Sequence, residues 1–278
     1  MSLGVLIAVL GAALLHASWN ALIKSGADKQ TGMFILSVGH AACGLALVPF
    51  FDWPAAEVWP WLVASGLIHM AYQLFLSYAY GEGDLSRVYP ISRGAAPMLV
   101  LVVSFVLGID TVRAMEVAGL VVLGLGIVLM AHGALARGES RRMLPFAFGA
   151  AAATAGYTLV DGLGARVWGE PVAYVAWLMI GSAVCYTPAI VALRGRAVLR
   201  ATGRVWALGL LAAVLSFLAY AIAIWAMTVA PIALVAALRE TSILFAVLIG
   251  WLVMGDPISR NKAWAAGLIV AGVMLTRV

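Results

Sequence analysis

Two arginines stand inside long apolar stretches of this sequence, where a charged side chain is costly. Arg93 belongs to SRVYPISRGAAP, residues 86–97, which opens one apolar run, and Arg239 lies inside another. If these runs cross a bilayer, each guanidinium must face a polar cavity or a partner rather than lipid. Because a guanidinium binds carboxylate or phosphate oxygens in bidentate geometry, the pattern predicts a site for an anionic or zwitterionic molecule. The alternative is an internal ion pair, for example Arg93 with Glu240.

Further polar and aromatic residues lie in the middle of apolar runs. We expect a shared cavity to be lined, besides the arginines, by Trp19, Asn20, His69, Tyr72, Tyr89 and Tyr157. A histidine changes charge near neutral pH, so His16, His69 or Glu240 is a candidate for coupling transport to a proton gradient. The alternative for each histidine is a neutral ring that hydrogen-bonds across a helix interface.

Two prolines flank Arg93. Pro90 and Pro97 each remove a backbone hydrogen bond, and the carbonyl groups they free are tolerated at membrane depth only where protein or water satisfies them. We therefore expect a kinked helix that could act as a gate, with a fixed kink that shapes packing as the alternative. The matching positions later in the chain, Ala236 and Ile243, hold no proline, so the kink is expected at Pro90 and Pro97 alone.

Asp161 and Arg166 lie toward one end of the apolar run 144–168. Long charged side chains near the end of a membrane helix can extend to the interface. We expect these two residues to be satisfied in that way or by a local contact with each other, and we place neither of them first in a substrate site.

The composition indicates a membrane environment. The chain has 278 residues, 64% of them hydrophobic and 10% charged, with a mean hydropathy of +1.06. Soluble domains are roughly half apolar and about a quarter charged, so the sequence predicts an integral membrane protein. The net charge of +5 does not indicate nucleic acid, because the basic residues fall in short gaps between apolar runs. Cys43 and Cys185 have no metal-type spacing, and neither a metal nor a cofactor is expected.

The gaps divide the chain into ten candidate membrane helices, each near the ~20 residues that cross a bilayer. They cover about 3–24, 30–51, 57–80, 85–108, 113–135, 144–168, 171–193, 204–229, 231–254 and 261–277. Arg93 and Arg239 lie within spans. The other lysines and arginines lie in the alternate gaps that face one side of the membrane, except Arg113, Arg166 and Arg277, which lie toward the other side. By the positive-inside rule both termini lie on the periplasmic or extracellular face of a bacterial-type inner membrane.

The sequence also repeats itself. GAALLHASWN (11–20) matches GAAAATAGYT (149–158), which pairs Trp19 with Tyr157. The other matches, in order along the chain, are Arg93 with Arg239, Asp110 with Asp256, Gly119 with Gly267 and Gly124 with Gly272. We therefore expect two homologous halves, 1–136 and 143–278. Because each half holds five spans, an odd number, the second is inverted relative to the first, an arrangement typical of secondary transporters.

The chain resembles the drug/metabolite transporter superfamily, of the EamA type. The resemblance is carried by Trp19, Asn20 and Lys24, by SYAYGEGDLSRVYPISRGAAP (77–97), and by GID (108–110) and GDP (255–257). It implies ten helices in which helices 1–4 and 6–9 surround a central cavity and helices 5 and 10 lie peripherally. Relatives move amino acids, other metabolites, sugars or drugs, commonly by proton exchange or facilitated exchange. The sequence departs from the family pattern at Ile243, where a proline is common, and HASWN (16–20) also resembles a subset associated with phosphonate utilisation.

These features predict a secondary transporter, a permease or exporter, for a small polar anionic or zwitterionic metabolite, working by alternating access as a monomer or homodimer. No motif of a soluble-type enzyme or of an ATPase is found in the sequence. A cation or multidrug exporter of the same fold is an alternative, and it would favour Glu240 or Asp161 as the binding group. A membrane-embedded lipid-modifying enzyme is another. A non-transporting assembly partner is the third, and it would depend on packing glycines such as Gly119 and Gly267.

Overall fold

The computed structural model describes residues 1–24, 29–82, 85–135, 142–254 and 260–276, apart from some side chains that include those of residues 80–94. The first half contains helices α1 (Leu3–Lys24), α2 (Lys29–Leu47), α3 (Trp59–Glu82), α4 (Leu85–Val106) and α5 (Ala114–Leu135), with a short 3-10 helix, η1 (Val48–Phe50), after α2. The second half contains α6 (Met143–Trp168), α7 (Pro171–Arg194), η2 (Gly195–Leu199), α8 (Gly203–Val229), α9 (Ile232–Arg239), α10 (Ser242–Met254) and α11 (Arg260–Leu275).

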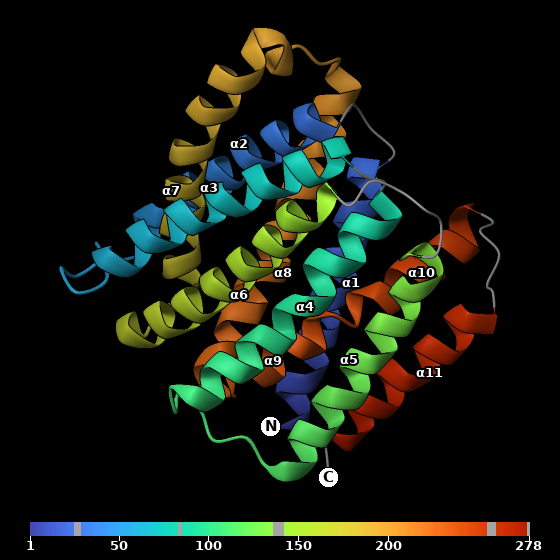
Figure 1. Ribbon diagram of the computed structural model, residues 1–278. Coiled ribbons are helices and arrows are strands. Elements are labelled where there is room, and N and C mark those ends of the chain that lie inside the picture. The colour runs from blue at the N-terminus through green and yellow to red at the C-terminus, as the bar shows by residue number, and fades with distance from the viewer. Residues whose placement is uncertain (25–28, 83–84, 136–141, 255–259, 277–278) are drawn as a thin grey trace.

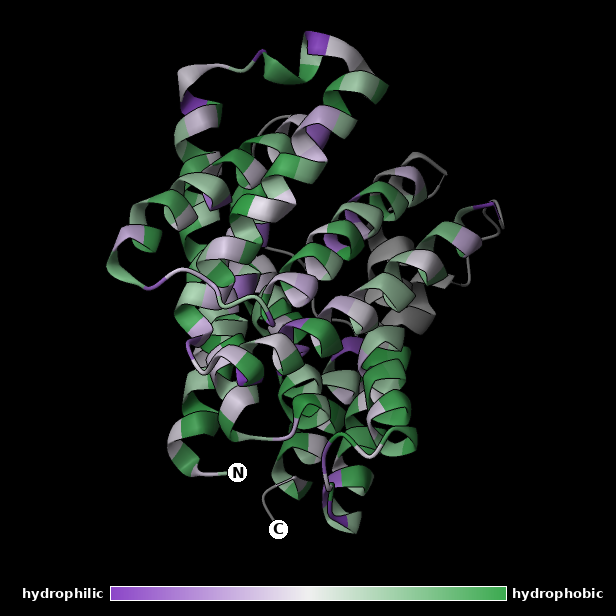
Figure 2. Cartoon of the chain, turned by 90° about the vertical axis from the view of Figure 1, so that its left-hand side faces the viewer, coloured by the Kyte–Doolittle hydropathy of each residue, from purple (hydrophilic) through white to green (hydrophobic). Residues whose placement is uncertain are grey.

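The helices are apolar enough to cross a membrane in several places. Among the described residues, six stretches have the necessary length and hydropathy, namely Leu3–Ile23, Gln30–Phe50, Met143–Trp168, Pro171–Leu193, Gly203–Val229 and Ile232–Leu252. Helices satisfy their own backbone groups, which lipid cannot do. Figure 2 shows apolar residues along most of the length of the helices. The chain is therefore a multi-pass membrane protein. The other four predicted spans are helical but do not meet the same measure, so ten spans remain a prediction.

The helices of the two halves pack in a symmetric pattern. Helix α1 packs against α8, α9 and α10, and its counterpart α6 packs against α3 and α4. Helices α2 and α7 pack against each other, as do α5 and α11, and α2 contacts α8 as α3 contacts α7. This pattern stays unchanged when each helix is exchanged with its counterpart in the other half. The counterparts are α1 and α6, α2 and α7, α3 and α8, α4 and the pair α9 and α10, and α5 and α11. Figure 1 shows α5 and α11 side by side at one edge of the molecule.

Small residues bring α5 and α11 into close contact. A Cβ atom added at Gly119 would meet the carbonyl oxygen of Gly272 at 2.7 Å, and one at Gly126 would meet that of Ala265 at 3.0 Å. Gly119 and Ala265 are the same number of residues apart in the sequence as Arg93 and Arg239, and so are Gly126 and Gly272. Exchanging the two halves therefore turns the contact of Gly119 with Gly272 into that of Ala265 with Gly126.

The expectation that Gly267 is a packing glycine is wrong. A Cβ atom at Gly267 would meet no described atom within 4 Å, and the residue is exposed, so Ala265 and Gly272 make the close contacts instead. The sequence match chose the wrong pair because several glycines lie within two turns of each helix.

Gly272→Leu is expected to lower the melting temperature of the purified protein by several degrees. A Cβ atom at this position would lie 2.6 Å from the backbone nitrogen of Leu123, and backbone cannot yield without separating α5 from α11. Overpacking of this kind typically costs ~1–3 kcal/mol. Gly267→Leu, on the same helix, is the matched control and should melt like the wild type. Equal melting of the two variants would contradict the described contact.

The helix interruption lies in the second half and not in the first. Helix α4 continues from Leu85 to Val106 through both prolines, whereas α9 ends at Arg239 and α10 begins at Ser242. At the interruption the amides of Glu240 and Thr241 donate to carbonyl groups only three residues back, at 3.0 and 3.1 Å. The expectation of one continuous helix over 231–254 is therefore wrong, and the kink at Pro90 and Pro97 stays a prediction. The prolines stay inside a helix, and the sequence RETS (239–242) forms the break instead.

The helix bundle has two ends. We call the end where α1 begins and α11 ends the terminal end, and the opposite end, where α1 ends and α11 begins, the basic end (Figure 1). The link between α4 and α5 also lies at the terminal end.

Candidate functional site

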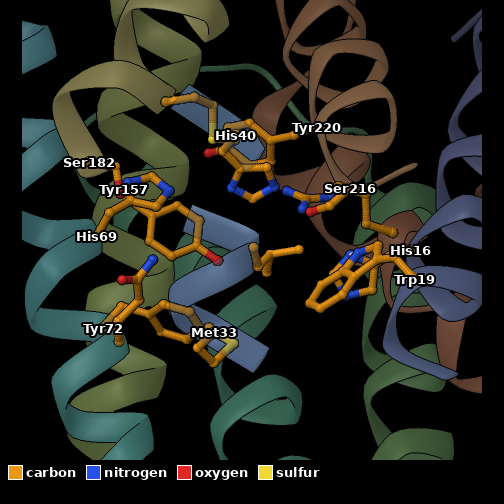
Figure 3. Close-up of a pocket in the computed structure, with 14 residues that line it drawn as sticks. His16, Trp19, Met33, His40, His69, Tyr72, Tyr157, Ser182, Ser216 and Tyr220 are labelled. Atoms are coloured by element: carbon orange, nitrogen blue, oxygen red, sulfur yellow. The ribbon is translucent and has the colours of Figure 1, made fainter. Parts of the chain in front are cut away.

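A cavity of about 90 Å³ lies between the two halves. Its walls come from α1, α2 and α3 of the first half and from α6, α7, α8 and α9 of the second. The aromatic and charged residues that line it are His16, Trp19, His40, His69, Tyr72, Tyr157, Tyr220 and Arg239. Figure 3 shows these side chains around a common space, with His69, Tyr72 and Tyr157 on one side and His16 and Trp19 on the other.

Three of the residues predicted from the sequence form one wall. The ring of His69 stacks on Tyr157 with 4.1 Å between the ring centroids, and Tyr72 meets Tyr157 edge to face at 5.5 Å. His69 and Tyr157 are buried, at 8% and 4% exposure. The structure thus brings His69 and Tyr72 of α3 together with Tyr157 of α6. The wall therefore contains residues of both halves.

The opposite wall belongs to α1. The Trp19 indole donates a hydrogen bond to His16 Nδ1 at 3.2 Å, and the two rings meet edge to face. The Asn20 amide donates to the carbonyl oxygen of His16 at 2.8 Å, one turn back on the same helix. Asn20 is not among the residues that line the cavity, so the structure gives no support to its predicted place there.

Arg239 enters the cavity from the last turn of α9. Its guanidinium carbon lies 5.1 Å from the centroid of the Tyr220 ring, a cation–π arrangement that holds the charge at the cavity wall. The C-terminal end of a helix also favours a cation, because the helix dipole is negative there. Arg93, Tyr89 and Pro90 lie outside the side chains that the structure describes, so their roles remain predictions.

A smaller space adjoins the helix interruption. It is lined by Pro97 of α4, by Tyr157 and Thr158 of α6, and by Arg239 and Glu240. Glu240, Thr241 and Ser242 are buried, at 4%, 2% and 1% exposure. Pro97 and Glu240 are thus neighbours of the same break, and their predicted gating and proton-coupling roles remain predictions.

Two buried polar atoms of the cavity wall make no hydrogen bond to the described residues. These atoms are Nε2 of His40 and Oε1 of Gln73, from α2 and α3. A buried polar atom without a partner is costly, and such sites are commonly completed by water or a ligand. Neither residue was among those expected to line the cavity.

Asp161 is the main residue of this region that the sequence analysis misplaced. It is 0% exposed and accepts hydrogen bonds from the hydroxyl groups of Tyr174, at 3.3 Å, and Tyr220. Its carboxylate also lies 3.9 Å from Nε2 of His69. The expectation of an interfacial side chain is therefore wrong. A signal was present, since Asp161 lies one turn after Tyr157 on the same helix face.

Arg166 does not pair with Asp161 either. Its guanidinium forms a two-pronged contact with Asp110, at 2.9 and 3.3 Å, and donates to the carbonyl oxygens of Met227 and Ala230. Asp110 also accepts the backbone N–H of Ile232 at 2.7 Å. We call Asp110, Arg166 and these backbone groups the terminal clasp, because they join the first half to α6, α8 and α9 at the terminal end.

The described residues offer no obvious metal site. No group of three His, Cys, Asp or Glu side chains comes together in the ranges that the structure describes. The described cavity wall offers hydrogen bonds, aromatic faces, imidazole rings and the guanidinium of Arg239.

The helices, the symmetric packing and the polar cavity between the halves define a helical membrane protein of the transporter class. The chain belongs to the EamA-like transporter family, whose sequence model matches residues 3–131 and again 141–278. This confirms the resemblance to the drug/metabolite transporter superfamily, and the phosphonate-associated subset stays a prediction. No curated protein sequence matches the chain.

A solved structure has the same fold. Its title reads "Crystal structure of protein", it is 18% identical in sequence, and the alignment covers 99% of this chain and 98% of the other, with a TM-score of 0.79. At this identity the likeness concerns the fold alone.

Proposed function

We propose that the protein is a secondary transporter for a small polar metabolite with an anionic group, free or as part of a zwitterion. The observation that carries this proposal is a cavity between two symmetric halves with the guanidinium of Arg239 in its wall. Arg239 binds the carboxylate or phosphonate group of the substrate. The aromatic wall of Tyr72 and Tyr157 packs against the rest of the molecule, and His40 and Gln73 offer it hydrogen bonds.

Alternating access follows from the same symmetry. In the proposed topology α9 and α10 form one interrupted span, so each half contributes five spans and the second is inverted. The symmetric packing of α1 with α6 and of α4 with α9 and α10 supports two repeats, 1–136 and 143–278, that rock against each other. Both termini lie on the periplasmic face of a bacterial inner membrane, as the distribution of basic residues predicts.

We propose that in the described arrangement the cavity is reached from the basic end. The lining residues Trp19 and Met33 lie close to the link between α1 and α2, which is at that end, whereas the terminal clasp joins the halves at the other end. The substrate therefore meets Arg239 from the basic end and leaves toward the terminal end after the clasp opens, or moves in the reverse direction.

A panel of ligands tests this proposal. Purified protein is heated with amino acids, phosphonates, simple carboxylates or organic cations, and the melting temperature is measured. We expect anionic or zwitterionic compounds to raise it and organic cations to leave it unchanged, because any ligand that binds only the folded state stabilises it. Each stabilising compound is then tested for uptake into proteoliposomes.

The cation exporter is the competing outcome of this panel. Asp161 does not line the cavity, because His69 and Tyr220 stand between the cavity and its carboxylate. Stabilisation by organic cations, without any by anions or zwitterions, would overturn the proposal in favour of that alternative. Stabilising compounds that are chemically altered rather than moved would indicate a membrane-embedded enzyme.

A further inference from the structure

Asp161 lies behind the cavity and receives contacts from both halves. Its carboxylate meets His69 of α3, Tyr174 of α7 and Tyr220 of α8, while Asp161 itself belongs to α6. At 0% exposure it is out of reach of a substrate in this arrangement. A carboxylate here therefore needs a reason other than direct substrate contact.

Among the described residues, no permanent cation lies within ion-pair distance of Asp161. In the part of the chain that the structure describes, His69 is the one basic side chain within ion-pair distance of this carboxylate. The tyrosine hydroxyl groups donate hydrogen bonds but carry no charge. Arg239 of α9 lies over the ring of Tyr220. The described side chains of α4, from residue 95 onward, are uncharged. A fully buried carboxylate without a counter-charge is strongly unfavourable, so a proton must compensate it.

The contacts of His69 limit that proton to two positions. Its Nδ1 atom lies 3.0 Å from the carbonyl oxygen of Ser65. A carbonyl oxygen only accepts, and the Ser65 hydroxyl, 3.2 Å from Nδ1, can accept as well. A hydrogen on Nδ1 therefore satisfies both contacts, and Nε2 is the atom that faces Asp161. One further proton then belongs either to Nε2, which gives an imidazolium and a carboxylate, or to Asp161 Oδ2, which gives two neutral groups. In both cases the Asp161–His69 pair is neutral overall and holds one exchangeable proton.

The pair also adjoins the proposed substrate site. His69 and Tyr220 each contact Asp161 and each line the cavity, His69 stacks on Tyr157, and Tyr220 lies under Arg239. A substrate that displaces either ring therefore changes the surroundings of the pair directly. Because the contacts come from α3, α6, α7 and α8, movement of the two halves also changes them.

We propose that the Asp161–His69 pair is the proton-binding site that couples transport to a proton gradient, a role that rests on the proposed transport function. The pair takes up a proton while the cavity is open to one side and releases it to the other. Loss of the proton leaves a bare carboxylate in a buried position, which favours an arrangement that lets water reach it. This assigns proton coupling to Asp161 with His69, in preference to His16 or Glu240.

An infrared measurement tests proton binding without a substrate. The pH-difference spectrum of the purified protein is recorded for the wild type and for Asp161→Asn, Glu240→Gln and Glu170→Gln, the last being an exposed carboxylate at the terminal end. We expect pH-dependent bands that belong to a protonated carboxyl group if the proton is on Oδ2, or to a carboxylate and an imidazolium if it is on Nε2. These bands should disappear in Asp161→Asn and persist in the other two variants. A spectrum unchanged by Asp161→Asn, or a band removed by Glu240→Gln instead, would overturn the proposal.

A second measurement tests coupling to the conformation. Ser216, which lines the cavity, is replaced by cysteine in a background lacking Cys43 and Cys185, and its labelling by N-ethylmaleimide is followed against pH. The same cysteine in an Asp161→Asn background gives the pH dependence of the thiol alone, since only the thiolate reacts. We expect an additional pH-dependent change that is lost in Asp161→Asn and retained in Glu170→Gln.

Identical pH profiles in the presence and absence of Asp161 would contradict the coupling. Failure of the transport proposal is separate, because neither measurement uses a substrate. A proton-binding pair found in a protein that transports nothing in the ligand panel would leave the site in place and remove its transport role.

Discussion

Arg239→Gln should strongly reduce stabilisation by anionic ligands and their uptake into proteoliposomes. The guanidinium is the one described positive side chain that lines the cavity, and it comes from a helix that ends there. Hydrogen bonds to a charged group are worth ~1.5–3 kcal/mol, so the affinity is expected to fall about 10- to 100-fold. Arg239→Lys should retain part of the binding, because an ammonium keeps the charge but loses the bidentate geometry.

Arg113→Gln is the control for a general effect of charge. Arg113 is exposed between α4 and α5, and its removal should change neither binding nor uptake. Loss of the Tyr220 contact could also weaken folding, so the melting temperature of each variant is measured without ligand. If Arg239→Gln binds the same ligands with unchanged affinity, the anionic group of the substrate lies elsewhere and Arg93 becomes the next candidate.

Asp110→Ala should shift the protein toward an arrangement open at the terminal end. The variant removes the two-pronged contact with Arg166 and the acceptor for the Ile232 amide. Both charged side chains are only partly exposed, at 26% for Arg166 and 12% for Asp110. Removing one partner of a buried pair costs ~3–5 kcal/mol, and we take the lower end of that range for this partly exposed contact. At about 1.4 kcal/mol per factor of ten, the closed population should then fall about 100-fold relative to the open one.

Pulsed electron paramagnetic resonance measures this shift. Spin labels at Leu107 and Val167, both exposed near the terminal end, should give a short distance in the wild type and an added long distance in Asp110→Ala. Arg166→Ala should produce the same population, and the double variant should add little, since both changes remove one interaction. A distance distribution unaffected by any of the three variants would mean that the clasp does not hold the terminal end closed.

The sequence predicted the membrane class, the family and much of the cavity wall because each depends on local composition or on repeated residues. Apolar runs of about 20 residues separated by basic gaps identify membrane helices without any knowledge of packing. His69, Tyr72 and Tyr157 were found because a polar or aromatic residue in mid-span stands out from its apolar neighbours. Arg239 was found for the same reason, and the cavity does contain it.

The errors concern contacts between helices that are distant in the chain. Asp161 and Arg166 were expected to extend to the interface or to satisfy each other locally, yet Asp161 bonds Tyr174 and Tyr220 whereas Arg166 bonds Asp110. Asp161 and Arg166 are close in the sequence, which favours a contact between them. The fold instead places the Asp110 carboxylate beside Arg166, near the ends of α6, α8 and α4. Such partners are set by the packing of α4, α6 and α8, which a single sequence does not report.

The break between α9 and α10 was missed for a related reason. Proline is the usual signal for an interrupted helix, and the first half carries two prolines where the second carries none. The RETS segment instead places the buried polar residues Glu240, Thr241 and Ser242 in succession. The hydroxyl of Thr241 donates to the carbonyl oxygen of Leu238 at 2.7 Å, in place of a partner provided by a regular helix. Interruption by polar side chains depends on burial, and burial follows from the tertiary fold.

Side-specific labelling of Ser216→Cys tests most directly whether the cavity between the halves opens to each face of the membrane in turn. In vesicles of known orientation, a membrane-impermeant maleimide is applied from one face and then from the other, with and without Asp110→Ala. We expect labelling from the basic end in the otherwise wild-type protein and clearly increased labelling from the terminal end once the clasp is removed. Labelling from the same single face in both proteins, at unchanged rates, would contradict this expectation.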